Sequence, residues 1–486
     1  MPDRQADVRA TEQCVGAAQP QRRHDAQPSD FAPVAQRGRS RAVVELTVGL
    51  VIALVMLRTW QVQWFVVTSG SMAPALLGQH ARTVCGECGL DFAWGIEGPE
   101  SLGRPAVCPN CGAIGPPVDD AAPTDGDRLP VVKAAFDFRL PRRWEIVAFR
   151  QPATATKVCV KRLVGLPGET IEIRDGDVFA DGQIQRKSLP QQRALAVSVY
   201  DNDFRPAPTS TLPPRWRTDE DASPWQADGG GFVHPQRAAI DDNGNGDRAD
   251  SPRIDWLTYH HQRRLPGVPD AAEESPVVDL CGYNQTRPVL TRYAVHDLLL
   301  SCRVKATGGG GVFFRARDGQ DEFVAVLDPG RQLAQLHRGG QQVLTWHGDL
   351  SGLVAGALVE VSLVDRQFLL ALDGQPLLVL PYDRNDGDGQ PTTRPLAIGS
   401  QGTAIEVRNL RVLRDVYYVP VAAAGTPPGG DASKCLAADE FYLLGDNSPL
   451  SHDSRRPSPD AAVPAKLLLG KPLVIHQRSW MLAGKQ

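Results

Sequence analysis

The sequence predicts a mainly β protein that carries an apolar helix near its amino terminus. Beyond Val66, apolar residues fall in short alternating runs separated by turn residues such as Asp-Gly and Gly-Gly, which is typical of antiparallel strands. Ahead of these runs, the stretch from Ala42 to Leu57 holds a single charge, Glu45, in sixteen residues. A chain of 486 residues is too long for one ordinary domain and indicates two to four units.

The apolar stretch has the composition of a membrane-spanning helix. A crossing needs about 20 residues, and extension through Trp64 supplies them, so we expect a transmembrane helix at residues 42–64. Positively charged flanks stay on the cytoplasmic side, and three such residues precede the stretch: Arg37, Arg39 and Arg41. Residues 1–41 lack apolar periodicity and are expected to form a disordered cytoplasmic tail. A cleavable signal peptide is the alternative interpretation.

The strand-like runs fall on both sides of a large insertion. Trp144–Phe149 and Glu169–Ile173 lie before it, and Glu440–Leu444 lies after it. We therefore expect residues 65–190 and 416–486 to form one β-rich domain that the insertion splits. The net charge of −4 gives no reason to expect a nucleic acid as partner.

The insertion, residues 194–415, is expected to hold a second β module. Its first part, to about Asp279, is rich in Pro, Asp, Arg and Gly and only weakly patterned. Regular runs follow at residues 312–319, 322–327, 359–365, 367–374 and 407–415. Strands of this length between tight turns favour an antiparallel β-sandwich. The pattern resembles the concanavalin-type lectin and glucanase sandwich, but it contains no motif that names a ligand. We expect a structural or protein-contact role for this module, and glycan binding is the alternative.

Ser71 and Lys161 form the candidate catalytic pair. A serine hydroxyl becomes an effective nucleophile when a base takes its proton, and lysine can act as that base only as the neutral amine, which requires apolar burial. On a strand, Lys161 shares a face with Leu163, while Arg162 points the other way. The lysine can therefore face a dry site. For the dipeptide alone, a solvated Lys-Arg pair on a surface strand is the alternative.

Three blocks, in the same order along the chain, resemble bacterial type I signal peptidase, a serine–lysine protease. They are Ser69-Gly70-Ser71-Met72, the run Val160–Glu169 and the run from Leu444 to Arg455. The third block has Ser448-Pro449-Leu450 where the family often has Arg-Asp-Asn, but it keeps the spacing. The resemblance covers the apolar stretch and residues 65–190 and 416–486. It identifies these two ranges as the first and second parts of a catalytic domain.

The resemblance implies a role for each matching residue. Ser71 would be the nucleophile and Lys161 its general base, and catalysis would need no cofactor. Ser69 would offer its hydroxyl to the oxyanion of the transition state, and Ser451 would orient the lysine amine. An ion pair would hold the third block in place, formed by Asp453 and Arg455.

The resemblance also implies a substrate and a location. The substrates would be secretory preproteins, whose signal peptides end in small residues before the cut. The enzyme would be a single-pass protein of the inner (cytoplasmic) membrane, with its catalytic domain on the outer, periplasmic side. Two other hypotheses for the function remain open. One is a serine–lysine regulatory peptidase with a restricted substrate, and the other is a catalytically silent membrane scaffold that displays the lectin-like module.

Two Cys-x-x-Cys pairs lie between Ser71 and Lys161. They are Cys85 with Cys88 and Cys108 with Cys111, and a glycine follows each pair. Their separation suits a zinc ribbon, which we expect at residues 82–115. A closed four-cysteine site would hold zinc structurally, because it leaves no position for a water molecule. Two disulfides are the alternative, since this segment is expected outside the cytoplasm.

Overall fold

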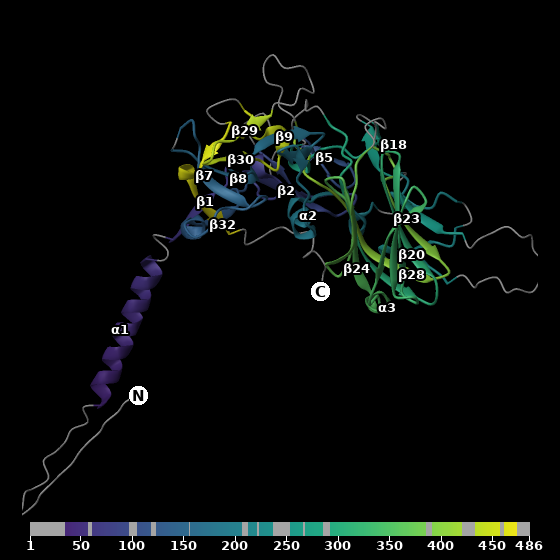
Figure 1. Ribbon diagram of the computed structural model, residues 1–486, viewed down its shortest axis with the longest axis horizontal. Coiled ribbons are helices and arrows are strands. Elements are labelled where there is room, and N and C mark those ends of the chain that lie inside the picture. Colours follow the sequence, from purple (N-terminus) through teal and green to yellow (C-terminus); the bar gives the residue numbers. More distant parts are fainter. Residues whose placement is uncertain are drawn as a thin grey trace, which may run out of the picture. The chain divides into compact units, whose positions relative to one another are not determined.

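The computed structural model is built mainly from β-strands, as the sequence predicts (Figure 1). The chain separates into two compact units, residues 1–57 and 58–486. The structure describes residues 35–56, 61–96, 105–117, 123–154, 156–206, 212–220, 223–236, 253–265, 268–284, 292–384, 391–419, 433–456 and 461–473. Most of the predicted cytoplasmic tail, residues 1–34, lies outside this set.

The first unit contains one described helix, α1 (Ala35–Met56), which begins inside the segment expected to be a tail. From residue 41 onward its side chains are exposed, including large apolar ones such as Leu46 at 74%. None of the helices in the described part of the chain is long and apolar enough to cross a membrane. The expected helix also ends too late, because Val62–Val66 forms strand β1 and pairs with Arg128–Val132. The β-branched and aromatic residues of β1 favour its pairing with Arg128–Val132.

A seven-stranded sheet organises the part of the second unit that carries Ser71 and Lys161. Its order is β1, β6 (Arg128–Val132), β32 (Leu468–Pro472), β7 (Ile146–Arg150), β8 (Val158–Gly165), β30 (Glu440–Leu444) and β31 (Val463–Pro464). β8 therefore lies beside β30, although the insertion separates them in sequence (Figure 1). A smaller sheet joins β11 (Gln183–Ile184), β10 (Asp177–Ala180), β9 (Thr170–Arg174) and β29 (Lys434–Cys435).

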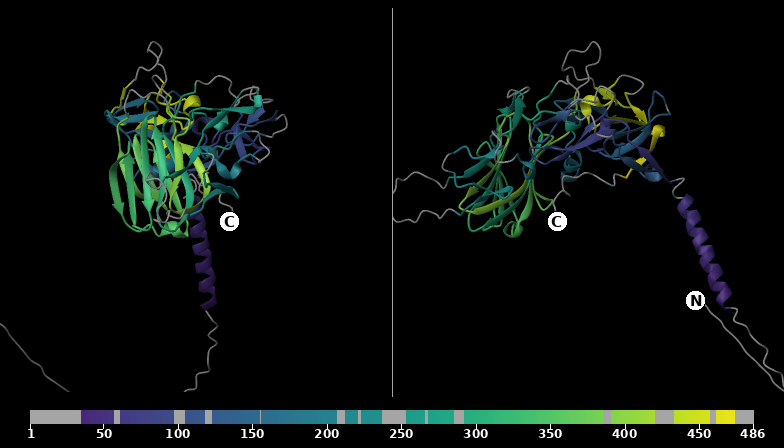
Figure 2. Two further views of the ribbon diagram at one scale, coloured as in Figure 1. Left: turned by 90° about the vertical axis from the view of Figure 1, so that its right-hand side faces the viewer. Right: turned by 180° about the vertical axis from the view of Figure 1, so that it is seen from behind.

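The insertion forms two larger antiparallel sheets. One has the order β14 (Gln226–Asp228), β15 (Gly231–His234), β28 (Ala404–Arg414), β19 (Leu298–Thr307), β24 (Ala357–Leu363), β25 (Gln367–Leu372) and β26 (Gln375–Pro381), with β12 (Val197–Asp201) also paired to β28. The other has the order β13 (Trp216–Arg217), β16 (Asp255–Tyr259), β27 (Leu396–Gln401), β20 (Gly311–Asp318), β21 (Asp321–Asp328), β22 (Leu333–Arg338) and β23 (Gln341–His347). Figure 2 shows the green strands of this region side by side.

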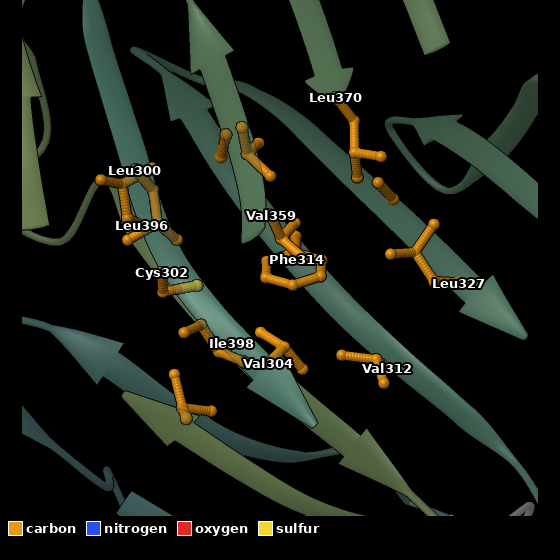
Figure 3. Close-up of a cluster of buried hydrophobic side chains, with 14 of the residues drawn as sticks. Leu300, Cys302, Val304, Val312, Phe314, Leu327, Val359, Leu370, Leu396 and Ile398 are labelled. Carbon is orange, nitrogen blue, oxygen red and sulfur yellow. The ribbon is translucent and has the colours of Figure 1, made fainter. Parts of the chain in front are cut away.

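The two sheets share one hydrophobic core. Alternate residues of β19, such as Cys302 and Val304, are fully buried and point toward Phe314 of β20 (Figure 3). The predicted sandwich strands therefore carry an inward apolar face at period two, which is what an antiparallel sandwich requires. Cys302 and Cys281 are both free thiols.

The weakly patterned first part of the insertion contributes more strands than the sequence suggested. β12, β15 and β16 all join the sandwich sheets, and Trp216 and Tyr259 are buried in its core. These strands are short, so few of their residues alternate. Their stability comes from pairing with longer strands that follow later in the chain, as β16 does with β27.

Short elements complete the second unit. Three hairpins are β2 (His80–Val84) with β3 (Asp91–Gly95), β4 (Pro105–Val107) with β5 (Ile114–Pro117), and β17 (Gln262–Leu265) with β18 (Val268–Glu274). The helices are α2 (Leu189–Leu195) and α3 (Gly352–Ala355), and the 3-10 turns are η2 (Gly70–Met72), η4 (Lys133–Phe136), η5 (Asn202–Phe204), η6 (Gly282–Asn284), η7 (Ser448–Leu450) and η8 (Ala465–Leu467).

Candidate active site

Ser71 lies in the 3-10 turn η2, just after strand β1. Apolar packing fixes the turn, because Met72 and Leu76 are almost fully buried against Leu129 of β6. The Ser71 backbone is also held from the third block, where Asn447 donates its N–H to the Ser71 carbonyl at 3.1 Å. The Ser71 side chain itself remains partly exposed.

Lys161 projects from the middle of β8 toward Ser71. Its Nζ donates a hydrogen bond to the Ser71 Oγ at 2.5 Å, and the residue is only 5% exposed. Burial lowers the pKa of Lys161 from 10.5 to about 8, although the nearby Asp453 carboxylate opposes this effect. A substantial fraction of the amine is then neutral near pH 8, as a general base requires.

Arg162 points to the opposite side of β8, as its place in the strand predicts. Its guanidinium makes two hydrogen bonds with the Asp446 carboxylate, at 2.7 and 2.5 Å, and a third with the Trp144 carbonyl. The pair is buried, with 3% and 2% of the two side chains exposed. The positive charge of Arg162 is thereby paired with Asp446 on the face of β8 opposite Ser71.

Asp453 and Arg455 form the ion pair that the resemblance implies. The guanidinium binds both carboxylate oxygens, at 2.8 and 2.7 Å, and also donates to the carbonyl oxygens of Val419 and Ser448. Burial alone would raise the pKa of Asp453, but Arg455 outweighs it and holds the pKa of this carboxyl below its usual value. Asp453 also accepts the Gly445 N–H at 3.0 Å, so the pair fixes the strand end beside Ser71.

Ser451 and Ser69 both lie close to Ser71. Ser451 is buried, and its hydroxyl lies beside the Asp453 carboxylate and helps to lower the pKa of that group. The Ser451 Oγ lies 2.2 Å from where a Cβ on Gly445 would stand, and the Ser71 carbonyl oxygen lies 2.4 Å from that point. Only glycine leaves room for this approach. The Ser69 Oγ lies 3.3 Å from the Ser71 Oγ.

A cleft of 460 Å³ opens over the pair. Ser69, Ser71 and Lys161 line it together with apolar side chains that include Phe65, Val158 and Leu450. An extended peptide segment with apolar side chains suits such a surface, because its backbone can reach the serine while its side chains meet the apolar part of the wall.

No sequence pattern indicates one residue of this site, Asn284. It comes from η6 in the insertion, and its amide exchanges two hydrogen bonds with the amide of Asn447, at 2.5 and 2.7 Å. Asn447 in turn donates to the Gly70 carbonyl at 2.8 Å. The neighbouring Tyr283 donates its hydroxyl to the Gln79 carbonyl at 2.7 Å. The insertion therefore contacts the segment that follows Ser71, where Tyr283 also packs against Ala73 and Leu77.

The four cysteines of the expected ribbon converge at the ends of two hairpins. Their sulfur atoms all lie within 4.8 Å of one another, and all four residues are buried free thiols. The distances between the Cys85 and Cys111 sulfurs and between the Cys88 and Cys108 sulfurs are both 3.6 Å. Gly89 and Gly112, which follow the pairs, have φ of 75° and 74°, as tight knuckles require.

The chain is similar to known signal peptidases over part of its length. The family described as signal peptidase, peptidase S26, matches residues 119–217, less than half of the chain. A probable signal peptidase I-1 of Synechocystis sp. is 35% identical over 98 residues, which cover 18% of this chain and 50% of that protein. Signal peptidase I V of Bacillus subtilis is 39% identical over 77 residues, which cover 16% and 45%. These matches support a type I signal peptidase.

The extent of these matches is limited. The chain spans half or less of the length of both relatives. The family match includes Lys161 but not Ser71 or the third block. Among solved structures, the carbohydrate-binding module CBM66 from Bacillus subtilis aligns with 32% of this chain and 94% of its own, at 10% identity and a TM-score of 0.21. At that score the likeness carries no argument about what the insertion binds.

Proposed function

We propose that this chain is a membrane-bound serine endopeptidase that removes signal peptides from secreted preproteins. The observation that carries the proposal is the direct contact between the buried Lys161 amine and the Ser71 hydroxyl. No structural need explains a lysine with a lowered pKa beside a partly exposed serine in an apolar cleft. Residues 65–190 and 416–486 would together form the catalytic domain, and residues 194–415 the inserted sandwich.

The geometry supports a two-step acyl transfer. Neutral Lys161 takes the proton of Ser71, whose Oγ attacks the scissile carbonyl carbon and forms a tetrahedral oxyanion. The Ser71 N–H and the Ser69 hydroxyl are the donors proposed to stabilise that charge. The protonated lysine then gives its proton to the leaving amine as the peptide bond breaks. Water, deprotonated by Lys161, hydrolyses the acyl-enzyme and frees Ser71.

The remaining site residues are proposed to position this pair. Ser451 would orient the Lys161 amine, with its buried Oγ beside Gly445 and the Ser71 backbone. Asp453 and Arg455 would fix the turn that carries Ser451. These residues complete the reaction without a cofactor.

A location in the cytoplasmic membrane is part of the same proposal. Its support is the sequence: apolar residues occupy every side of α1 from residue 42 onward, and arginines precede them. The catalytic domain would then lie on the outer, periplasmic side, where preproteins emerge. The test is alkaline extraction of membranes that contain the full chain. Release of the protein into the soluble fraction would contradict the anchor.

The four cysteines are proposed to hold a structural zinc ion. Zinc with a tetrahedral shell and Zn–S bonds of about 2.3 Å places sulfur atoms about 3.8 Å apart, and the two sulfur–sulfur distances of 3.6 Å fit this arrangement. The ion would join the two hairpins, β2–β3 and β4–β5, whose own core is small. It would take no part in peptide hydrolysis.

The deciding experiment is cleavage of a secretory preprotein by the full chain in detergent, beside its Ser71→Ala variant. We expect a cut after a small-x-small motif, established by sequencing the new amino terminus, and no cut by the variant. Lys161→Arg should also be inactive, because a guanidinium does not lose its proton at working pH. Cleavage of one dedicated protein but not of general preproteins would indicate a restricted regulatory peptidase. No cleavage of any substrate by folded protein would indicate the silent scaffold.

A further inference from the structure

A second cavity, separate from the catalytic cleft, lies between the cysteine hairpins and the insertion. Its volume is 510 Å³, within the range of small-ligand sites, about 300–1,000 Å³. Apolar side chains form part of its wall, among them Val107, Ile114 and Val199. Pro449 of η7 also lines it, while the next residue, Leu450, lines the catalytic cleft.

The charge of the cavity wall is strongly positive. Five arginines line it, and Asp279 is the only acidic residue among the lining residues. Two of the arginines are paired, Arg263 with Glu273 and Arg264 with Glu87.

The other three arginines have no carboxylate ion pair within the described part of the chain. Arg414 donates only to backbone carbonyls, and Arg215 contacts the Tyr259 hydroxyl and the His261 ring. Arg292 is exposed at the edge of the cavity. Arg292 and Arg414 act electrostatically on Asp279, but one carboxylate does not balance the arginines of the wall. Excess positive charge on a concave, partly apolar wall favours an anionic ligand.

Two buried polar groups of the wall lack a partner among the residues that the structure describes. They are the Gln262 Nε2, a donor, and the Asp279 Oδ2, an acceptor, on residues that are 6% and 4% exposed. Buried polar atoms are normally satisfied, because each one left unpaired costs free energy. A ligand that fills the cavity would need an acceptor for Gln262 and a donor for Asp279.

We propose that this cavity binds an acidic peptide segment. A peptide bond supplies a carbonyl for Gln262 and an N–H for Asp279, and an adjoining Glu or Asp side chain supplies the anion for the arginines. The apolar wall accommodates the neighbouring side chains. Such a segment could belong to a preprotein or to a separate peptide, and both present the same chemistry. The inference does not depend on peptide cleavage.

The test is isothermal titration calorimetry on the full chain carrying Ser71→Ala, so that no probe is cut. The probe is acetyl-Leu-Glu-Val-amide, and its matched control is acetyl-Leu-Gln-Val-amide, which lacks only the charge. We expect the Glu peptide to bind at least about tenfold more tightly than the Gln peptide. Inorganic phosphate should neither match its affinity nor displace it, because phosphate cannot use Gln262 and Asp279 together with the apolar wall.

Two further variants locate the binding in the cavity. Arg292→Gln should weaken the Glu peptide about tenfold, whereas Arg331→Gln, at an exposed arginine of the sandwich, should leave it unchanged. Gln262→Leu should also weaken binding while the protein still folds, since it removes a donor that is unpaired in the free protein. Four results would each overturn the proposal: no heat at about 1 mM peptide, equal affinity for both peptides, displacement by phosphate, or equal effects of the two arginine variants.

Once peptide binding is established, a competition experiment distinguishes a preprotein from a separate peptide as the source of the acidic segment. A full-length preprotein with an acidic mature segment is added to the complex with the free peptide. Competition between them at the cavity is the expected result. A preprotein that binds without displacing the peptide would assign the cavity to separate peptides alone.

Discussion

Replacing Lys161 by methionine should abolish cleavage and, at the same time, stabilise the fold at neutral pH. The residue is 5% exposed, and burial lowers its pKa from 10.5 to about 8. Between these two values the unfolded chain holds a proton that the folded chain has released, so folding stability rises with pH across this window. At pH 7 the difference corresponds to about 3 kcal/mol of unfolding free energy. A neutral methionine of similar length avoids that cost, and water can solvate the partly exposed Ser71.

The assay is chemical denaturation of the wild type and Lys161→Met at pH 7 and pH 10. We expect the variant to be more stable by about 3 kcal/mol at pH 7 and by only about 1 kcal/mol at pH 10, because pH 10 lies only about half a unit below the unfolded-state pKa of 10.5. Lys305→Met, at an exposed lysine of β19, is the control and should stay within about 0.5 kcal/mol of the wild type at both pH values. A variant that is less stable at pH 7, or a gain that does not change with pH, would refute the reasoning.

Three further substitutions test other parts of the site. Gly445→Ala places a Cβ 2.2 Å from the Ser451 Oγ and 2.4 Å from the Ser71 carbonyl oxygen, so kcat for peptide cleavage should fall at least about tenfold, roughly 1.4 kcal/mol in the barrier; unchanged kcat would contradict the close packing. Asn284→Ala removes the partner of the buried Asn447 amide and should lower kcat more than it changes KM. The control Asn202→Ala, at a buried asparagine elsewhere in the insertion, should lower stability without lowering kcat. Equal effects of the two variants on kcat would exclude positioning by Asn284. Cys85→Ser should reduce bound zinc, measured by mass spectrometry of metals, and lower the thermal midpoint; an unchanged zinc content would refute the four-cysteine site.

The strands of both β regions could be predicted where alternation is long and regular. The runs at residues 312–319 and 322–327 became β20 and β21, because a strand with one buried face needs an apolar residue at every second position. The short strands of residues 197–259 could not be predicted in this way. Their stabilising partners, such as β27 and β28, lie far away in sequence, and local pattern carries no information about such pairing.

The candidate site was predictable to the extent that its chemistry lies in motifs. Strand alternation already places Lys161 and Arg162 on opposite faces, and the structure has this arrangement. The end of the apolar helix was predicted less well, because Val62 to Trp64 suit either an interfacial helix end or a strand, and pairing with β6 selects the strand. Asn284 could not be found at all, since its contact with Asn447 spans 163 positions.

The pH dependence of peptide cleavage tests most directly whether Lys161 is the base for Ser71. At pH 8 about half of a lysine with a pKa of about 8 is neutral, compared with about 0.3% of a lysine with a pKa of 10.5. We therefore predict that kcat/KM for a fluorogenic signal-peptide substrate rises about tenfold per pH unit below pH 8 and levels off above it. A profile that is flat through pH 8, or that first rises near pH 10.5, would contradict a buried, neutral Lys161 as the base.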